Sequence, residues 1–169
     1  MSVEFSWEHP QASIAGLPGE LVPLIGTLPL ATLFDAAARA EQIGVGGDEV
    51  LVAAGVVKRE AYTRRLAAWL GLPFAELNGN EDASDLPPPQ LPALAAGFIA
   101  LKRTAAGLMI ALAPQGRRIR GLIRLVRTQP DIGRTLCLTS PGRLEASVLR
   151  RAGPRLAAAA ARAHGCRRS

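Results

Sequence analysis

The residues of this chain that could carry chemistry are few, and their spacing argues against a catalytic centre. Gly44-Val45-Gly46-Gly47 resembles part of a phosphate-binding loop, but the Gly-Lys-Ser/Thr that would hold a nucleotide phosphate is missing. The two histidines, His9 and His164, lie near opposite ends of the chain, so no Ser-His-Asp or Cys-His set can be proposed. We therefore predict that the chain is not an enzyme and has no catalytic residue.

Residues that could bind a metal are equally sparse. Glu81, Asp82 and Asp85 form a small acidic cluster, but it lacks the alternate-ligand spacing and the glycine of a calcium-binding EF-hand. Cys137 lies in an apolar run and is expected to be a buried hydrophobic side chain, whereas Cys166 lies close to the C-terminus. The sequence thus predicts neither a metal site nor a bound cofactor.

The most regular polar pattern is a stripe of four arginines, Arg117, Arg120, Arg124 and Arg127. Their spacing places them on one face of a helix, opposite an apolar stripe. Residues 86–169 carry 15 basic and 2 acidic side chains, whereas residues 1–85 carry 5 and 12. The stripe predicts a surface for an acidic protein or for anionic lipid headgroups, with a plain solvated face as the alternative. No aromatic side chain accompanies the arginines to stack on bases, so nucleic acid is the partner that we expect least.

The first half of the chain reads as a small helical lobe over residues 30–77, after an irregular segment over 1–29. Apolar residues at helical spacing predict helices over 31–42, 48–54 and 58–70. The side chains expected to face the core are Leu33, Phe34, Ala37, Ala40, Tyr62, Leu66, Trp69 and Leu70. Those expected to face water are Arg59, Thr63 and Arg64. Asp48 is the predicted N-cap of the second helix.

The second half predicts a compact α/β lobe over residues 97–152, separated by an acidic and proline-rich linker over 78–96. Strands are expected at 98–102, 108–112 and 135–138, the first two joined as a hairpin. One helix is expected over 117–127, and another begins after Ser140 with Leu144, Val148 and Leu149 facing inward. Residues 153–169 form an Ala- and Arg-rich tail. The predicted fold class is therefore α+β, a helical lobe followed by a lobe with a three-stranded sheet.

A family resemblance covers residues 30–152. Gly55-Val56-Val57, a helix, and then Leu70-Gly71-Leu72-Pro73-Phe74 resemble the N-terminal domain of the type II secretion ATPase, general secretory pathway protein E, of the GspE/MshE type. Residues 39–74 are most similar to the version that precedes bacterial family 2 membrane glycosyltransferases. The resemblance implies a non-catalytic regulatory or protein-interaction domain, either the regulatory portion or a truncated relative of such an enzyme. The partner would be a membrane-bound glycosyltransferase or a component of a secretion or pilus ATPase system.

Part of the same family binds cyclic di-GMP through tandem repeats that begin with Arg-Leu-Gly and end with Gln. In this chain Gly46, Gly47 and Asp48 stand where Arg-Leu-Gly belongs, and Trp69 replaces the Gln. A faint earlier copy lies 29 residues upstream and lacks the same Arg and Gln. We interpret this as a retained fold with a lost ligand site, and a cyclic di-GMP sensor is the alternative.

No apolar run in the sequence is long enough to span a bilayer. The best candidate, residues 21–30, is broken by Pro23, Gly26 and Pro29. The first residues lack the basic and apolar segments of a signal peptide. We expect a bacterial protein of the cytoplasm, with weak peripheral contact at an anionic inner membrane.

Overall fold

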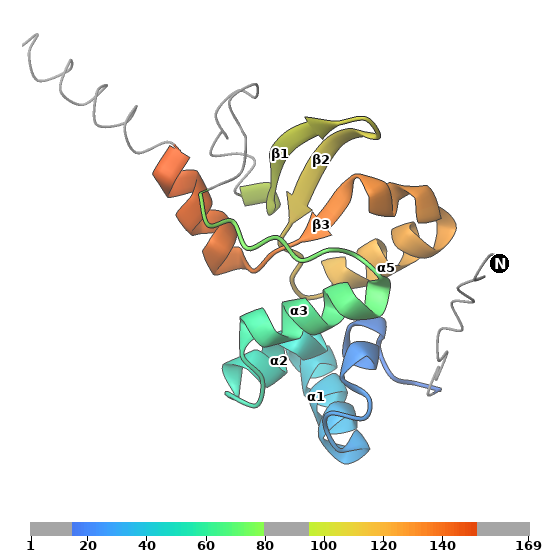
Figure 1. Cartoon of the computed structure of the whole chain (residues 1–169). Helices are drawn as coiled ribbons and strands as arrows, with labels where there is room; N and C mark the ends of the chain where they lie inside the picture. The colour runs from blue at the N-terminus through green and yellow to red at the C-terminus, as the bar shows by residue number, and fades with distance from the viewer. Residues whose placement is uncertain (1–14, 80–94, 152–169) are drawn as a thin grey trace, which may run out of the picture.

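A computed structural model describes residues 15–79 and 95–151 and shows an α+β fold, as predicted (Figure 1). A group of helices lies on one side of a three-stranded sheet. Most of the predicted linker and all of the predicted tail over 153–169 lie outside the described residues, as do residues 1–14. Within the described residues, no helix has the length and hydropathy needed to cross a membrane.

The helical part contains a 3-10 helix, η1 (Gly19–Leu24), and the helices α1 (Leu30–Ile43), α2 (Gly47–Ala53) and α3 (Arg59–Leu70). The helix η1 falls in the segment predicted to be irregular, and its Leu21 and Leu24 are buried in the core. Gly44 and Gly71 end α1 and α3 in the left-handed conformation, which glycine adopts without steric cost.

These helices form two copies of one unit, a short helix, a glycine turn and a long helix. Gly26 and Gly55 each have a positive φ, 79° and 70°. Each long helix begins four residues after its glycine, at Leu30 and at Arg59. The 29-residue offset seen faintly in the sequence is therefore a repeat of architecture.

The sheet consists of β1 (Phe98–Thr104), β2 (Gly107–Leu112) and β3 (Leu136–Leu138), in that order. The strands β1 and β2 pair antiparallel and form the predicted hairpin, and β3 pairs parallel to β2. The segment after α3 extends the sheet, because the Ala75 N–H donates to the Leu138 carbonyl at 2.7 Å and the Leu138 N–H donates to that of Pro73 at 2.9 Å. The hairpin and the three-stranded sheet are thus confirmed.

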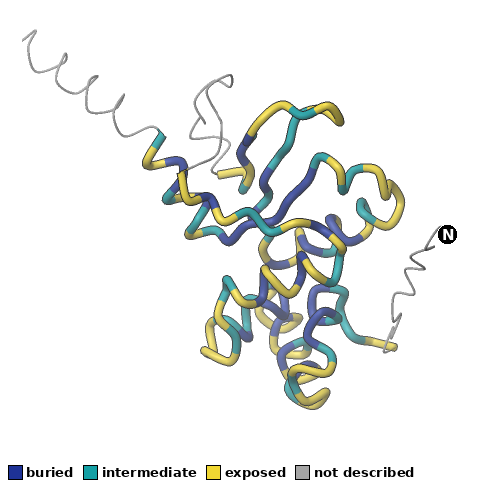
Figure 2. Tube along the Cα trace, in the orientation of Figure 1, coloured by how far each residue is buried: buried dark blue, intermediate teal, exposed yellow. Residues whose placement is uncertain are grey.

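The connection from β2 to β3 contains α5 (Arg118–Thr128) and a second 3-10 helix, η2 (Pro130–Arg134). The helix α5 lies between the sheet and the helical part. Its Ile119, Leu122 and Ile123 share one core with residues of η1, α1, α3 and β3 (Figure 2). The two predicted lobes are therefore joined through a common interior.

A C-terminal helix over residues 141–151 packs against the other face of the sheet. Its Leu144 and Val148 are buried with Ile99 and Leu101 of β1. The predicted inward position of Leu149 is wrong, since that side chain is exposed.

Three side chains of the helical part also lie differently from the prediction. Arg59 was expected to face water, but its side chain is only 19% exposed and pairs with the buried Asp48. Phe34 is exposed because the buried face of α1 is centred on Leu33, Ala36 and Ala40, and adjacent helical residues are 100° apart. Thr63 was expected to face water but is buried. Its hydroxyl donates to the Arg59 carbonyl at 2.9 Å, so the side chain meets its own hydrogen-bonding need inside the helix.

Candidate interaction site on helix α5

The four arginines of the predicted stripe do lie on one side of α5, but they have different partners. The Arg117 Nε donates to the Val45 carbonyl at 3.2 Å. Arg120 donates two hydrogen bonds, each 2.7 Å, to the carboxylate of Glu20. The Arg127 guanidinium lies 5.5 Å from the centre of the Trp69 ring. Arg124 is exposed and has no partner among the described residues.

The sequence of α5 explains which face of the helix is exposed to solvent. Ile119, Leu122, Ile123 and Val126 recur at helical spacing and turn toward the shared core. The opposite half carries the exposed arginines Arg117, Arg118, Arg124 and Arg127, which we call the α5 basic face. On the same half, Gly121 and Thr128 are also exposed and Leu125 is half-buried, and α5 contains no acidic residue.

Arg120 is excluded from this face because it holds a fully buried carboxylate. Glu20 is 0% exposed, and besides Arg120 it accepts a hydrogen bond from the Gly47 N–H at 3.2 Å. Burial alone would raise the pKa of Glu20, but the hydrogen bonds and the charge of Arg120 outweigh it, so the pKa is lowered. Glu20, Arg120 and Gly47 form what we call the buried clasp, which ties η1 and α2 to α5.

A second buried carboxylate lies beside the clasp. Asp48 pairs with Arg59 and accepts the Gly116 N–H at 3.2 Å. Asp48 was predicted to be the N-cap of α2, but Gly46 takes that place, and the Glu49 carboxylate accepts the Gly46 N–H at 2.9 Å. The prediction failed because Asp48 is drawn inward by Arg59 and Gly116.

Glycines make this junction possible. A Cβ atom added to Gly46 would lie 2.4 Å from the Cα of Gly116, and one added to Gly116 would lie 2.2 Å from a carboxylate oxygen of Glu49. Residues 46–48 are all buried. The part of the chain that aligns with the Arg-Leu-Gly of the cyclic di-GMP motif is therefore covered by the start of α5.

Sequence reasoning missed both buried carboxylates. One signal was available for Glu20, which is the only charged residue between Gly16 and Leu33 in an otherwise apolar stretch. A lone acid in such a stretch favours a buried, paired carboxylate. No comparable signal marked Asp48, because its partner Gly116 is 68 residues away.

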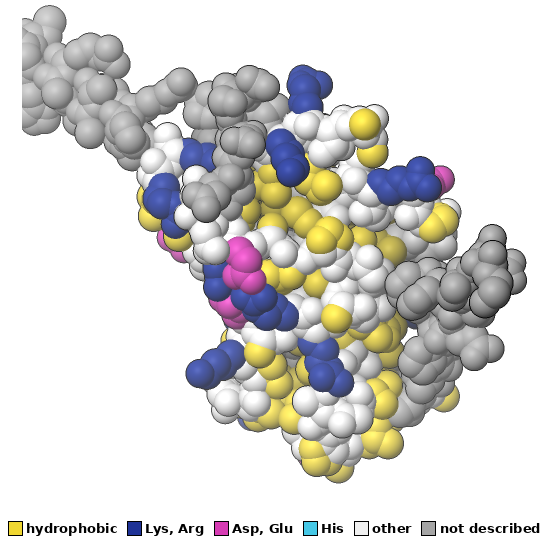
Figure 3. Space-filling view, in the orientation of Figure 1, with side chains coloured by type: hydrophobic (Ala, Val, Ile, Leu, Met, Phe, Trp, Pro, Cys, Tyr) yellow, Lys and Arg dark blue, Asp and Glu magenta, His cyan; other side chains and the backbone are white. Residues whose placement is uncertain are grey.

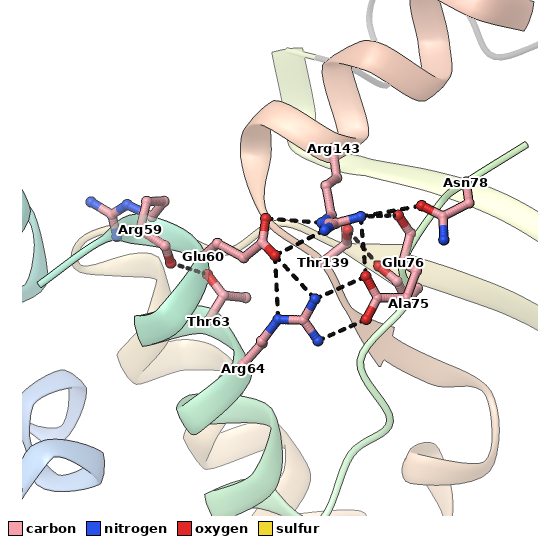
Figure 4. Close-up of polar contacts among 9 residues, drawn as sticks. All are labelled: Arg59, Glu60, Thr63, Arg64, Ala75, Glu76, Asn78, Thr139 and Arg143. Atoms are coloured by element: carbon pink, nitrogen blue, oxygen red, sulfur yellow. Dashed lines mark hydrogen bonds and ion pairs between the residues drawn. The ribbon is translucent and has the colours of Figure 1, made fainter.

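A second set of ion-paired side chains connects α3, the segment that follows it and the C-terminal helix at the surface (Figure 4). The Arg143 Nη2 lies 2.9 Å from Glu60, and the Arg64 Nη1 lies 2.7 Å from Glu76. We call these four residues the charged seam; acidic and basic side chains are grouped there in the space-filling view (Figure 3). Hydrogen bonds from Arg143 and Arg64 lower the pKa of Glu60 to about 2.

An open cavity of about 360 Å³ lies beside the charged seam. Its charged lining residues are Glu60, Glu76, Arg143 and Arg150. All four already have partners within the chain, since Arg150 donates to the Leu77 carbonyl. The cavity therefore offers no unpaired charge to a ligand.

The described part of the chain contains no metal-binding cluster and no reactive thiol. No group of three or more His, Cys, Asp or Glu residues there could hold a metal ion. Cys137 is buried, and burial raises the pKa of its thiol to about 11, which leaves the thiol protonated at neutral pH.

Comparison with known proteins supports the fold. No protein-family model and no curated protein sequence matches the chain. Among solved structures, one of MshE with cyclic di-GMP matches 79% of this chain and 99% of that chain, with a TM-score of 0.60 and 18% sequence identity. This chain has the fold of that MshE domain. At such low identity the likeness establishes the fold alone.

Proposed function

We propose that this chain is a non-catalytic regulatory domain of the GspE/MshE N-terminal type that acts by binding a protein partner. The observation that carries the proposal is the match to nearly the whole MshE chain. The sequence adds that no P-loop lysine and no catalytic histidine set is present. A domain with this fold and without such residues is suited to positioning a neighbouring protein.

The finer proposal concerns the partner. The resemblance of residues 39–74 favours a bacterial membrane glycosyltransferase, of which this chain would be the regulatory portion or a truncated relative. A secretion or pilus ATPase system is the alternative, and MshE favours it as a neighbour in fold. In either case we place the chain in the cytoplasm, beside the inner membrane.

Cyclic di-GMP binding is the second candidate function, and the ligand of the MshE structure favours it. Two observations weigh against it in this chain. Gly46, Gly47 and Asp48 replace the Arg-Leu-Gly that the resemblance would require, so the arginine that could grip a phosphate is missing. The same three residues are buried, and Gly116 lies against Gly46.

Co-purification tests the main proposal. The full chain would be co-expressed with the proteins encoded by neighbouring genes, one at a time, and isolated through a tag. We expect a stoichiometric complex with a membrane glycosyltransferase or with a secretion component. Failure to bind any of them, with the purified chain folded, would contradict the proposal.

A further inference from the structure

We propose that the α5 basic face is a docking surface for an anionic lipid bilayer. The proposal rests on the function above only in placing the chain beside a membrane. It names a second contact of the domain, in addition to the protein partner.

Four observations carry it. Arg117, Arg118, Arg124 and Arg127 are exposed on a helix without acidic residues. Arg118 and Arg124 have no partner among the described residues, so their charges are available. In the described part of the chain, the face makes one ion pair, between Arg117 and the exposed Glu41 at 3.6 Å. The buried clasp and the shared core hold α5 in place, so the arginines are presented by a fixed helix.

The residues between the arginines indicate which kind of partner fits. Gly121 has open space around it, and the Thr128 hydroxyl is turned back to the Arg124 carbonyl at 3.0 Å. Leu125, which is half-buried, is the one large apolar side chain on this half of α5, so the fully exposed positions offer only arginines, Gly121 and Thr128. Protein interfaces usually centre on buried aromatic and aliphatic anchors, and single-stranded nucleic acid is gripped by aromatic stacking. A surface whose exposed side chains are mostly arginines fits the phosphates of lipid headgroups.

The contact would be weak and purely electrostatic. The apolar stripe of α5 is buried, so the helix cannot insert into the acyl region. Attraction between basic residues and an anionic leaflet falls off within a Debye length, about 8 Å at physiological ionic strength. Binding should therefore be reversible and sensitive to salt.

Vesicle co-sedimentation of the full chain tests the proposal. The probe is a vesicle of phosphatidylcholine with or without a large share of phosphatidylglycerol. We expect binding to the anionic vesicles at low salt, no binding at high salt, and none to neutral vesicles. The double variant Arg118→Gln and Arg124→Gln should weaken binding by roughly 30-fold, from the usual contribution of each basic residue near such a surface.

A matched control separates docking from net charge. Lys102→Gln with Arg103→Gln removes two exposed charges, without partners among the described residues, from β1 instead of α5. We expect this variant to bind within about 3-fold of the natural chain. Equal losses in both double variants, equal binding to neutral vesicles, or no binding to anionic vesicles at low salt would each overturn the proposal. None of these results bears on the proposal of a protein partner, because co-purification tests that proposal separately.

Discussion

Glu20 and Arg120 join two parts of the chain that lie 100 residues apart. The carboxylate is completely buried, whereas the arginine side chain is 38% exposed. Removing one partner of a buried pair leaves a charge in the interior without compensation, which typically costs about 3–5 kcal/mol. Because water reaches part of Arg120, we expect Arg120→Ala to lower the free energy of unfolding by about 2–3 kcal/mol.

Urea denaturation would measure this loss. Arg124→Ala is the matched control, because Arg124 lies on the same helix and is exposed without a partner among the described residues. A surface change of this kind should alter stability by less than about 0.5 kcal/mol. Equal effects of the two substitutions would show that the clasp contributes nothing to stability.

Three carboxylates, Glu20, Glu60 and Glu76, have lowered pKa values, and these predict how stability depends on pH. Glu60 has a pKa of about 2 in the folded chain against an ordinary 4.5, and that of Glu20 is also lowered. A group with a lowered folded pKa stabilises the fold above its unfolded pKa, and this stabilisation is lost as the pH falls through the folded value. Stability should therefore decline from about pH 4.5 toward pH 2.

Thermal unfolding followed across this pH range checks the prediction. In Glu60→Gln the decline should be shallower, because one of the two carboxylates with a lowered pKa at the charged seam is gone and only Glu76 remains. Glu145→Gln provides a control with an exposed carboxylate on the C-terminal helix. A Glu60→Gln profile as steep as that of the natural chain would contradict the role of the seam.

At the residue scale, the sequence predicted the core better than the polar interior. Hydrophobic periodicity identified Leu33, Tyr62 and Leu66 correctly, because burial of an apolar face is a local property of the pattern. It could not find the contacts of Glu20 with Arg120 or of Asp48 with Gly116, because these depend on where α5 and the residue before it lie in three dimensions. Periodicity also misplaced Arg120. Its position in the sequence predicts an exposed side chain, but that side chain binds the buried Glu20 carboxylate.

At the scale of elements, the junction between α2 and α5 depends on the absence of side chains. Gly46→Ala would place a Cβ atom 2.4 Å from the backbone of Gly116, which cannot move aside as a flexible side chain could. Overpacking of this kind typically costs about 1–3 kcal/mol. We expect a loss of at least this size, measured by chemical denaturation.

Gly121→Ala is the matched control within α5. Gly121 lies inside the helix with nothing within 4 Å of its added Cβ atom. Alanine there should stabilise the chain by roughly 0.5–1 kcal/mol, because it loses less backbone freedom on folding. Opposite signs for the two substitutions are expected, and a stabilised Gly46→Ala variant would contradict the close approach to Gly116.

The elements themselves were largely predictable. Helices α1 and α3, the hairpin and β3 lie within one or two residues of their expected positions, because glycine stops and apolar periodicity mark them locally. The 3-10 helix η1 was missed, since Pro18, Pro23 and Gly26 read as loop signals. Its formation depends on burial of Leu21 and Leu24 in a core supplied by distant parts of the chain.

At the scale of the whole molecule, the shared core joins the two predicted lobes. Ile119 and Ile123 of α5 are buried with Leu21 and Leu24 of η1. Each such side chain contributes about 1.5–3 kcal/mol when fully buried, so separating the lobes would cost much of the stability of a small domain. We expect one cooperative unfolding transition, with the same midpoint by far-UV circular dichroism and by hydrogen exchange of β2. Two separate transitions would show that the lobes fold independently.

The proposed function makes this chain a docking domain that does not sense a nucleotide. Calorimetric titration of the full, folded chain with cyclic di-GMP tests it most directly, because the MshE fold is known with that ligand. We expect no saturable heat, since residues 46–48 lack the arginine and are buried, with Gly46 against Gly116. Saturable binding at micromolar concentration would contradict the account and make the chain a nucleotide sensor.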